Sequence, residues 1–167
     1  MNNELALYFC LFLALWSAVI GGVFSAFSEF VMSGLLRAAP AGGIESMQHI
    51  NKTVLKTQFV IGIFAIGAFS VLFAVYSLAA FAGGAQTAII LASAVYLPTV
   101  LLMTMMGNVP MNNKLAGLDH RSVAAKAYWV RYGRIWTRLN HVRTGGSIAT
   151  AALYIIAAVT LLRGGAV

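Results

Sequence analysis

One glutamate and two histidines have side chains that could together hold a metal ion. Glu29 lies inside an apolar run, on a helical face shared with small residues at positions 14, 18, 22 and 25. Small residues mark the packing faces of membrane helices, so we expect Glu29 to point into the protein, where an acid indicates function. The alternative is an ion pair with Arg37 or Arg143. His49 and His141 are each more typical of structural positions, but two imidazoles meeting Glu29 would suit non-haem iron or copper.

Three asparagines could supply hydrogen-bond donors near the same ends of the apolar runs. Asn51 lies on the apolar side of a short amphipathic segment, so its amide is expected to be buried and hydrogen-bonded. Asn108 and Asn112 flank Pro110, where they either cap a helix or donate to an oxygen atom of a ligand. A buried carboxylate such as Glu29 could then remove a proton from an acidic carbon, while the amides hold the resulting oxyanion.

A later segment combines aromatic and basic side chains on two helical faces. Tyr132 and Trp136 lie on one face, and Arg131, Arg134 and Arg138 form the opposite stripe. The two rings could guide a flat aromatic substrate, although an aromatic belt at the membrane interface explains them as well. The three arginines are expected to be solvated.

Membrane helices are the elements that must position these side chains. The chain has 167 residues, of which 60% are apolar and 9% are charged, against about 25% charged in a soluble domain. These values exclude a disordered chain, a disulfide scaffold and a cytosolic enzyme. A transmembrane helix needs about 20 apolar residues, and Gly83 and Gly84 divide the longest uncharged block into a hairpin. The sequence predicts a single all-α domain over residues 1–167, a four-transmembrane-helix bundle with spans at about 5–35, 58–82, 86–107 and 142–163.

Both long loops are predicted to contain helical segments. Pro40 and the glycines after it end the first helix, and apolar residues then recur at helical spacing, which predicts a short interfacial helix. In the second loop, residues 107–113 are expected to be extended, and Asp119 is the expected N-cap of a helix that begins at His120. This amphipathic helix either lies on the lipid headgroups or is a cytoplasmic extension leading into the fourth span.

The net charge of +7 is distributed on one side of the predicted bundle. The first loop carries three basic residues and the second carries seven, whereas only Arg163 falls on the opposite side. The positive-inside rule therefore predicts an integral membrane protein of a bacterial inner membrane, with both long loops cytoplasmic and both termini outside. The basic balance indicates topology and contact with anionic lipid, and no nucleic-acid partner is expected.

Four short stretches, in order along nearly the whole chain, resemble the anthrone oxygenase-like family of small integral membrane proteins. They are FSAFSEFVM at 24–32, MQHIN at 47–51, GNVPMNNKL at 107–115 and WTRLNHVRT at 136–144. The resemblance implies a four-helix membrane protein, and characterised members are oxygenases that convert an anthrone to an anthraquinone, with copper dependence suggested for some. Many members have no known reaction. Carried over to this chain, the resemblance implies Glu29, His49 and His141 as metal ligands, and Asn51, Asn108, Asn112 and Arg143 as neighbouring or substrate-contacting residues.

These observations lead to two functional hypotheses of different class. The first is a membrane-embedded oxygenase that oxidises a hydrophobic aromatic, anthrone- or quinol-like substrate with dioxygen. Copper is the expected metal, with iron or no metal as alternatives. The second is a non-catalytic membrane protein that binds a lipid or a partner through its basic cytoplasmic layer. The expected partners are the lipid bilayer, the aromatic molecule and dioxygen, and a homodimer or partner subunit would enlarge the small space that four spans enclose.

Overall fold

The computed structural model of the protein describes residues 3–164, and four long helical segments make up most of it. Each is long and apolar enough to cross a membrane, which confirms the predicted all-α class and four-span bundle. The first segment comprises α1 (Asn3–Ala26), the π-helical η1 (Phe27–Val31) and α2 (Met32–Arg37); α3 (Pro40–Val54) and α4 (Gln58–Ala80) follow. The third segment comprises α5 (Gly83–Tyr96), η2 (Leu97–Leu102), η3 (Thr104–Asn108) and α6 (Val109–Ala116), and the fourth is α7 (Val123–Gly164).

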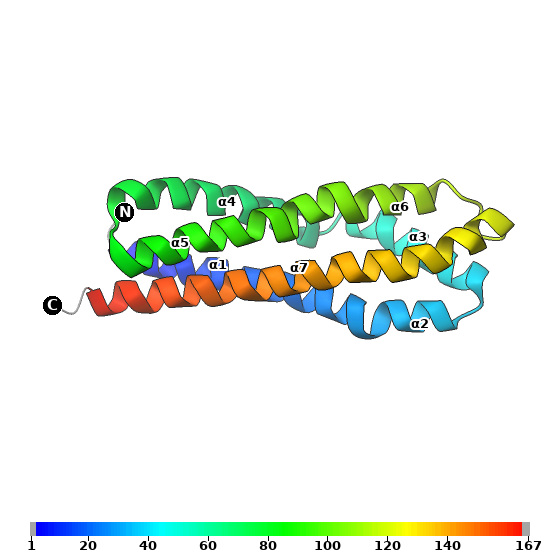
Figure 1. Cartoon of the computed structure of the whole chain (residues 1–167), viewed down its shortest axis with the longest axis horizontal. Helices are drawn as coiled ribbons and strands as arrows, with labels where there is room; N and C mark the ends of the chain where they lie inside the picture. Colours follow the sequence, from blue (N-terminus) through cyan, green and yellow to red (C-terminus); the bar gives the residue numbers. More distant parts are fainter. Residues whose placement is uncertain (1–2, 165–167) are drawn as a thin grey trace.

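The long helices run side by side in an elongated bundle (Figure 1). Helix α7 packs along α1 and α5, and α4 packs against α5 and α1. Both chain ends and the α4–α5 connection lie at one end of the bundle, while α2, α3 and α6 lie toward the other (Figure 1). The α4–α5 connection is tight because Gly83 has a φ of 69°, a conformation that favours glycine.

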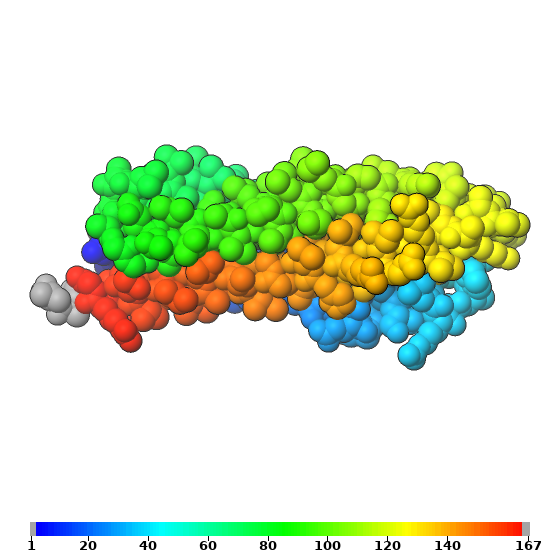
Figure 2. All heavy atoms as spheres, viewed as in Figure 1, coloured from blue at the N-terminus to red at the C-terminus, as the bar shows by residue number. Residues whose placement is uncertain are grey.

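Helix α7 is much longer than a membrane span requires. Its 42 residues correspond to about 60 Å of helix, twice the roughly 30 Å of a hydrocarbon core. In the space-filling view it follows almost the whole length of the molecule (Figure 2). Of the two alternatives for the amphipathic segment, the structure therefore shows the extension of the fourth span. Tyr132 and Trp136 are buried there, and Arg131, Arg134 and Arg138 are exposed as expected.

Residues 107–113 are helical, so the prediction of an extended stretch is wrong. The third span contains two prolines, and a proline normally breaks an α-helix. The π-helical turns η2 and η3 lie at or just before these prolines. Pro98 lies within η2, and Pro110 stands in the first turn of α6, immediately after η3. A proline lacks an N–H and collides with the carbonyl four residues earlier, and a wider π-turn relieves both constraints. The third span thus continues as one helical segment to Ala116.

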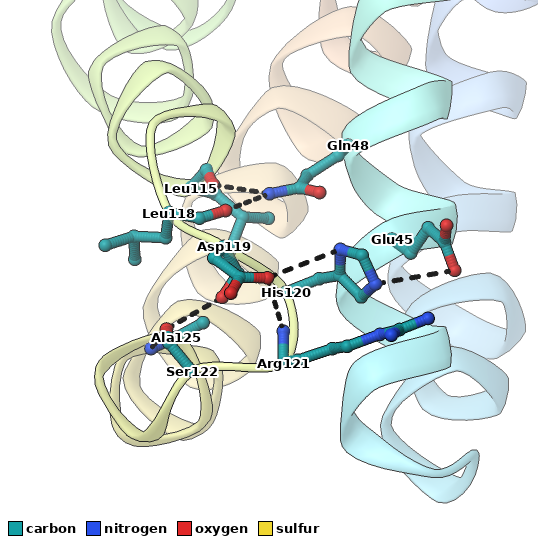
Figure 3. Close-up of polar contacts among 9 residues, drawn as sticks. All are labelled: Glu45, Gln48, Leu115, Leu118, Asp119, His120, Arg121, Ser122 and Ala125. Atoms are coloured by element: carbon teal, nitrogen blue, oxygen red, sulfur yellow. Dashed lines mark hydrogen bonds and ion pairs between the residues drawn. The ribbon is translucent and has the colours of Figure 1, made fainter.

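The connection between α6 and α7 is held to α3 by side chains (Figure 3). Gln48 Nε2 donates to the carbonyl oxygens of Leu115 and Leu118, at 2.8 Å each. The expected helix start at His120 is wrong by three residues, since α7 begins at Val123. The residue that caps this helix is Ser122 and not Asp119, because Ser122 Oγ accepts from the Ala125 nitrogen at 3.0 Å. Asp119 Oδ1 instead closes a local turn by accepting from the Arg121 nitrogen at 3.0 Å.

Two separate hydrophobic cores stabilise the bundle. One lies between the membrane spans and includes Ile20, Tyr96 and Tyr154; the other lies at the α2–α3 end and includes Met47, Leu115 and Trp129. A layer of polar side chains separates these cores at the level of α3, and this layer contains the candidate site.

Candidate functional site

A cavity of about 190 Å³ lies between the end of α1, α3, the first turns of α4, η3, α6 and the middle of α7. Its wall is mostly apolar, and it is aromatic at Phe24, Phe27, Phe59 and Trp136. Its lining includes the exposed apolar residues Val23, Leu55 and Val109, so part of the cavity wall lies at the surface of the protein. The polar side chains that line it are Asn51, Lys52, Thr104, Asn108, Asn112, Asn113, Asn140 and Arg143.

Arg143 places a cation inside this largely apolar cavity. The residue is 5% exposed, and its guanidinium carbon lies 4.1 Å from the ring centre of Phe24 and 5.5 Å from that of Trp136. Its Nη1 donates to Thr104 Oγ1 at 3.3 Å and its Nη2 donates to Asn140 Oδ1, while its Nε is buried without a partner. The ion pairs found within residues 3–164 involve His120 and not Arg143. The guanidinium is therefore buried among neutral groups.

Asn140 fixes the position of Arg143. Its side chain is completely buried, and its Nδ2 donates to the carbonyl oxygen of Phe24 at 2.5 Å and to Ser28 Oγ at 2.6 Å. These two bonds orient Oδ1 toward Arg143, because an amide that donates through nitrogen presents its oxygen on the other side. The π-turn η1 contributes Ser28 to this arrangement.

Asn108 lines the cavity and has a buried hydrogen-bond acceptor without a partner. It is 1% exposed, and its Nδ2 donates to the Trp136 carbonyl oxygen at 3.2 Å. Its Oδ1 is buried without a partner. Thr104 precedes Asn108 by one turn of η3, so their side chains lie on the same side of this helical turn. Thr104 accepts from Arg143, and Asn108 carries the acceptor without a partner.

Asn112 is held by two aromatic donors. Its Oδ1 accepts from Tyr132 OH at 2.7 Å and from Trp136 Nε1 at 2.8 Å. Both lone-pair directions of the oxygen are thereby used, and the Nδ2 donors remain for the cavity that Asn112 lines. Tyr132 is fully buried between the rings of Trp129 and Trp136 and does not line the cavity. Of the two predicted substrate contacts, only Trp136 therefore lines the cavity.

The predicted convergence of Glu29, His49 and His141 is wrong. All three side chains are exposed, and none lines the cavity. Glu29 accepts a hydrogen bond from Ser25 Oγ at 2.6 Å on the outer surface of the first span. The buried face of α1 instead follows Leu13, Ser17 and Gly21. Every face of this helix is apolar or small, so the sequence offered two candidate packing faces. The predicted face was the one that carries Glu29, and the structure buries the other face.

The cavity does not have the donor set of a copper or iron site. Within residues 3–164 no three side chains of His, Cys, Asp or Glu are grouped so that they could hold a metal. The polar donors of the lining are amides, a hydroxyl and two cationic groups, and its one sulfur ligand is the thioether of Met47. Copper and iron in proteins prefer imidazole, thiolate or carboxylate ligands. The residues present therefore do not fit the metal that the family resemblance suggests.

The structure does group most of the other predicted residues. Asn51, Asn108, Asn112 and Arg143 all line the one cavity, although Asn51 Nδ2 has no acceptor in hydrogen-bonding geometry, contrary to expectation. The cavity is also lined by polar residues that were not predicted from the sequence: Lys52, Thr104, Asn113 and Asn140. Asn140 precedes Arg143 by three positions on one helical face, a spacing that could have revealed it.

Fold and cavity together define a class: a four-helix integral membrane protein with a cationic, amide-rich cavity close to one end of its spans. A sequence model described as anthrone oxygenase matches residues 52–162, and the chain belongs to this family. The matched residues include Asn108, Asn112, Asn140 and Arg143. A search of curated proteins and a search of solved structures find no match to the chain.

Proposed function

We propose that the protein is a membrane-embedded oxygenase that oxidises a hydrophobic aromatic ketone or quinol, of the anthrone type, with dioxygen. The observation that carries the proposal is the buried, uncompensated Arg143 guanidinium in an aromatic-walled cavity. Such a cation stabilises negative charge that develops on a substrate oxygen far more effectively than it would in water. Membership of the anthrone oxygenase family supports the same reaction class.

The chemistry needs a stabilised oxyanion. The methylene of an anthrone is acidic because its carbanion is conjugated with the ketone, and loss of the proton places charge on the ketone oxygen. Arg143 and the Nδ2 group of Asn112 would hold that oxygen. The carbanion carbon then forms a bond to dioxygen, and the resulting hydroperoxide loses water. One oxygen atom becomes the new carbonyl of the quinone, and the other leaves in water with the two methylene hydrogens.

Glu29 has no part in this scheme, because it lies on the outer surface and bonds Ser25. Phe24 and Trp136 instead confine the flat ring system beside Arg143. The exposed apolar part of the wall at Val23 and Val109 suits a substrate that arrives from the bilayer, where dioxygen is also more soluble than in water. We further propose that this end of the bundle faces the cytoplasm, because most basic residues lie there.

The decisive experiment measures anthrone oxidation by the purified protein in lipid nanodiscs. Quinone formation and oxygen uptake should both exceed the spontaneous rate in empty nanodiscs, with one dioxygen consumed per quinone. Arg143→Gln should lower the rate by about 10²-fold or more, the usual cost of removing a donor to an oxyanion. Arg138→Gln removes an exposed cation from the same helix and should leave the rate unchanged. A wild-type rate equal to that of empty nanodiscs would refute the proposal.

The same assay tests the role of metal. We expect the rate to survive dialysis against a chelator of copper and iron, and to stay within twofold in His141→Ala and Glu29→Gln, since neither side chain lines the cavity. A rate that is lost on dialysis and restored by one added metal would show that a metal acts at ligands outside the cavity lining.

A further inference from the structure

The cavity carries positive charge and lacks negative charge. Both Arg143, which is buried, and Lys52, which is exposed, line it. Among the described residues of the lining there is no aspartate or glutamate. A cation taken out of water loses several kcal/mol of hydration unless an anion or a full set of hydrogen bonds replaces it.

Arg143 has only part of that compensation. Its hydrogen bonds end on the neutral oxygens of Thr104 and Asn140, and its Nε has no partner. The ring faces of Phe24 and Trp136 offer a weak attraction from their quadrupoles. A planar anion placed against these rings would supply the missing charge and accept from the guanidinium.

Asn108 adds a second requirement to the ligand. Its buried Oδ1 has no donor, and leaving such an acceptor unsatisfied is unfavourable. Thr104 and Asn108 lie one turn apart on η3, and Thr104 bonds Arg143. The cavity lining therefore contains a cation and, on the turn of η3 that bonds this cation, a residue with an unsatisfied acceptor that a ligand hydroxyl would satisfy.

We infer that the cavity selects the ionised form of planar aromatic acids that carry a hydroxyl beside the anionic oxygen. The anionic oxygen accepts from Arg143, the hydroxyl donates to Asn108 Oδ1, and the rings of the ligand lie against the apolar and aromatic wall of the cavity. Lys52 attracts such anions toward the cavity. The biological use of this selectivity rests on the proposed function. The substrate class is thereby narrowed to acids that ionise before or on binding.

Three probes that cannot be oxidised at a methylene test this inference by binding alone. They are a hydroxynaphthoate with adjacent hydroxyl and carboxylate, the naphthoate without the hydroxyl, and the neutral naphthamide. Dissociation constants are measured at neutral pH in nanodiscs of zwitterionic lipid, so that the lipid does not compete as an anion. The wild-type protein should bind naphthoate roughly tenfold to a hundredfold more tightly than naphthamide, as expected for a hydrogen bond between charged groups. Hydroxynaphthoate should bind more tightly still.

Variants assign each preference to its residue. Arg143→Gln should reduce the naphthoate-to-naphthamide preference to about 1, and its retained naphthamide binding shows that the cavity is intact. Arg143→Lys should keep the preference, and it serves as the test if the glutamine variant does not fold. Asn108→Leu should remove the advantage of the hydroxyl alone, and Arg138→Gln should change nothing.

Two results would overturn the inference: equal wild-type affinity for naphthoate and naphthamide, or a charge preference that survives in Arg143→Gln. Anthrone oxidation is measured separately. Anion binding without oxidation would refute the proposed function only, and oxidation without anion preference would refute this inference only.

Discussion

At the scale of single residues, the amide at position 140 keeps the charge of Arg143 available. Asn140 accepts from the guanidinium while its nitrogen is occupied by Phe24 and Ser28. A carboxylate in this position would pair with Arg143 and neutralise the cavity, and it would have no proton for the Phe24 carbonyl. A neutral residue thus positions the cation without compensating it, which is the arrangement that an anion-binding cavity requires.

Asn112 provides a test of how the aromatic wall is held. Asn112→Ala removes the acceptor of two hydrogen bonds, those donated by Tyr132 OH and Trp136 Nε1. Both donor groups then lack a partner at a place that water reaches only in part. We expect the free energy of unfolding to fall by about 2 kcal/mol, seen as a lower thermal midpoint in detergent. Asn113→Ala, an exposed neighbour, should leave the midpoint unchanged.

Asn112→Asp separates the structural role of the residue from its role toward the ligand. The carboxylate still accepts from Tyr132 and Trp136, so the thermal midpoint should stay near that of the wild type. Its charge lies in the same cavity as Arg143, and it has no N–H for a substrate oxygen, so anthrone oxidation should fall. For the two alanine variants, equal thermal midpoints of Asn112→Ala and Asn113→Ala would show that the hydrogen bonds from Tyr132 and Trp136 contribute little to stability.

The sequence predicted Asn51, Asn108, Asn112 and Arg143 of the cavity lining, missed the amide of Asn140, and failed for the acid and the histidines. A polar residue near the end of an apolar run does not settle its own burial, because Arg143 is buried and His141, two residues earlier, is exposed. For Glu29 the outcome depended on which of two small-residue stripes of α1 meets α7. In a membrane helix both faces are apolar, so the pattern could not distinguish them.

At the scale of elements, the third span shows how prolines can be included in a continuous helix. The stretch around Pro110 was predicted to be extended, and the structure instead continues the helix through the π-turns η2 and η3. The extra residue in a π-turn rotates everything that follows it relative to an α-helix, so the π-turns influence which face of α6 carries Asn112. Helical periodicity alone could not reveal this shift, whereas the length of the uncharged apolar blocks was sufficient to predict all four spans.

Close approach between α7 and the third span depends on Gly146. A Cβ at this position would lie 1.9 Å from Thr99 Oγ1 and 2.6 Å from Thr99 Cβ. Because Thr99 Cβ is attached to the backbone, the helices must move apart to accept it. Gly146→Ala should destabilise the protein by about 1–3 kcal/mol, the usual effect of overpacking, measured by thermal unfolding in detergent.

Gly145 supplies the matched control for this substitution. A Cβ at Gly145 would meet nothing within 4 Å, and alanine is favoured over glycine in a helix by up to about 1 kcal/mol. Gly145→Ala should therefore be neutral or slightly stabilising. Equal destabilisation by both substitutions would indicate a general effect of alanine on α7 and would contradict the close contact with Thr99.

At the scale of the whole molecule, the bundle separates its charges along its length. The end that carries both chain ends has few ionisable groups, and the end with α2, α3 and α6 has most of the arginines and lysines (Figure 1). The second hydrophobic core also belongs to that end, so the helices stay packed after they leave the apolar layer. The cavity lies between these regions, so the substrate proposed above would meet the cation Arg143 next to the apolar part of the bundle.

Orientation in the membrane can be tested with thiol labelling, because the wild-type chain has one cysteine, Cys10, and it is buried. Ala82→Cys places an exposed thiol at the α4–α5 connection, and Ser46→Cys places one on α3, at opposite ends of the bundle. The positive-inside rule puts α3 in the cytoplasm. A membrane-impermeant maleimide should therefore label Ala82→Cys in intact cells and should label Ser46→Cys only after lysis, with the wild type unlabelled. The reverse pattern would show that the cavity lies near the outer leaflet, and the charge asymmetry would then need an explanation other than insertion.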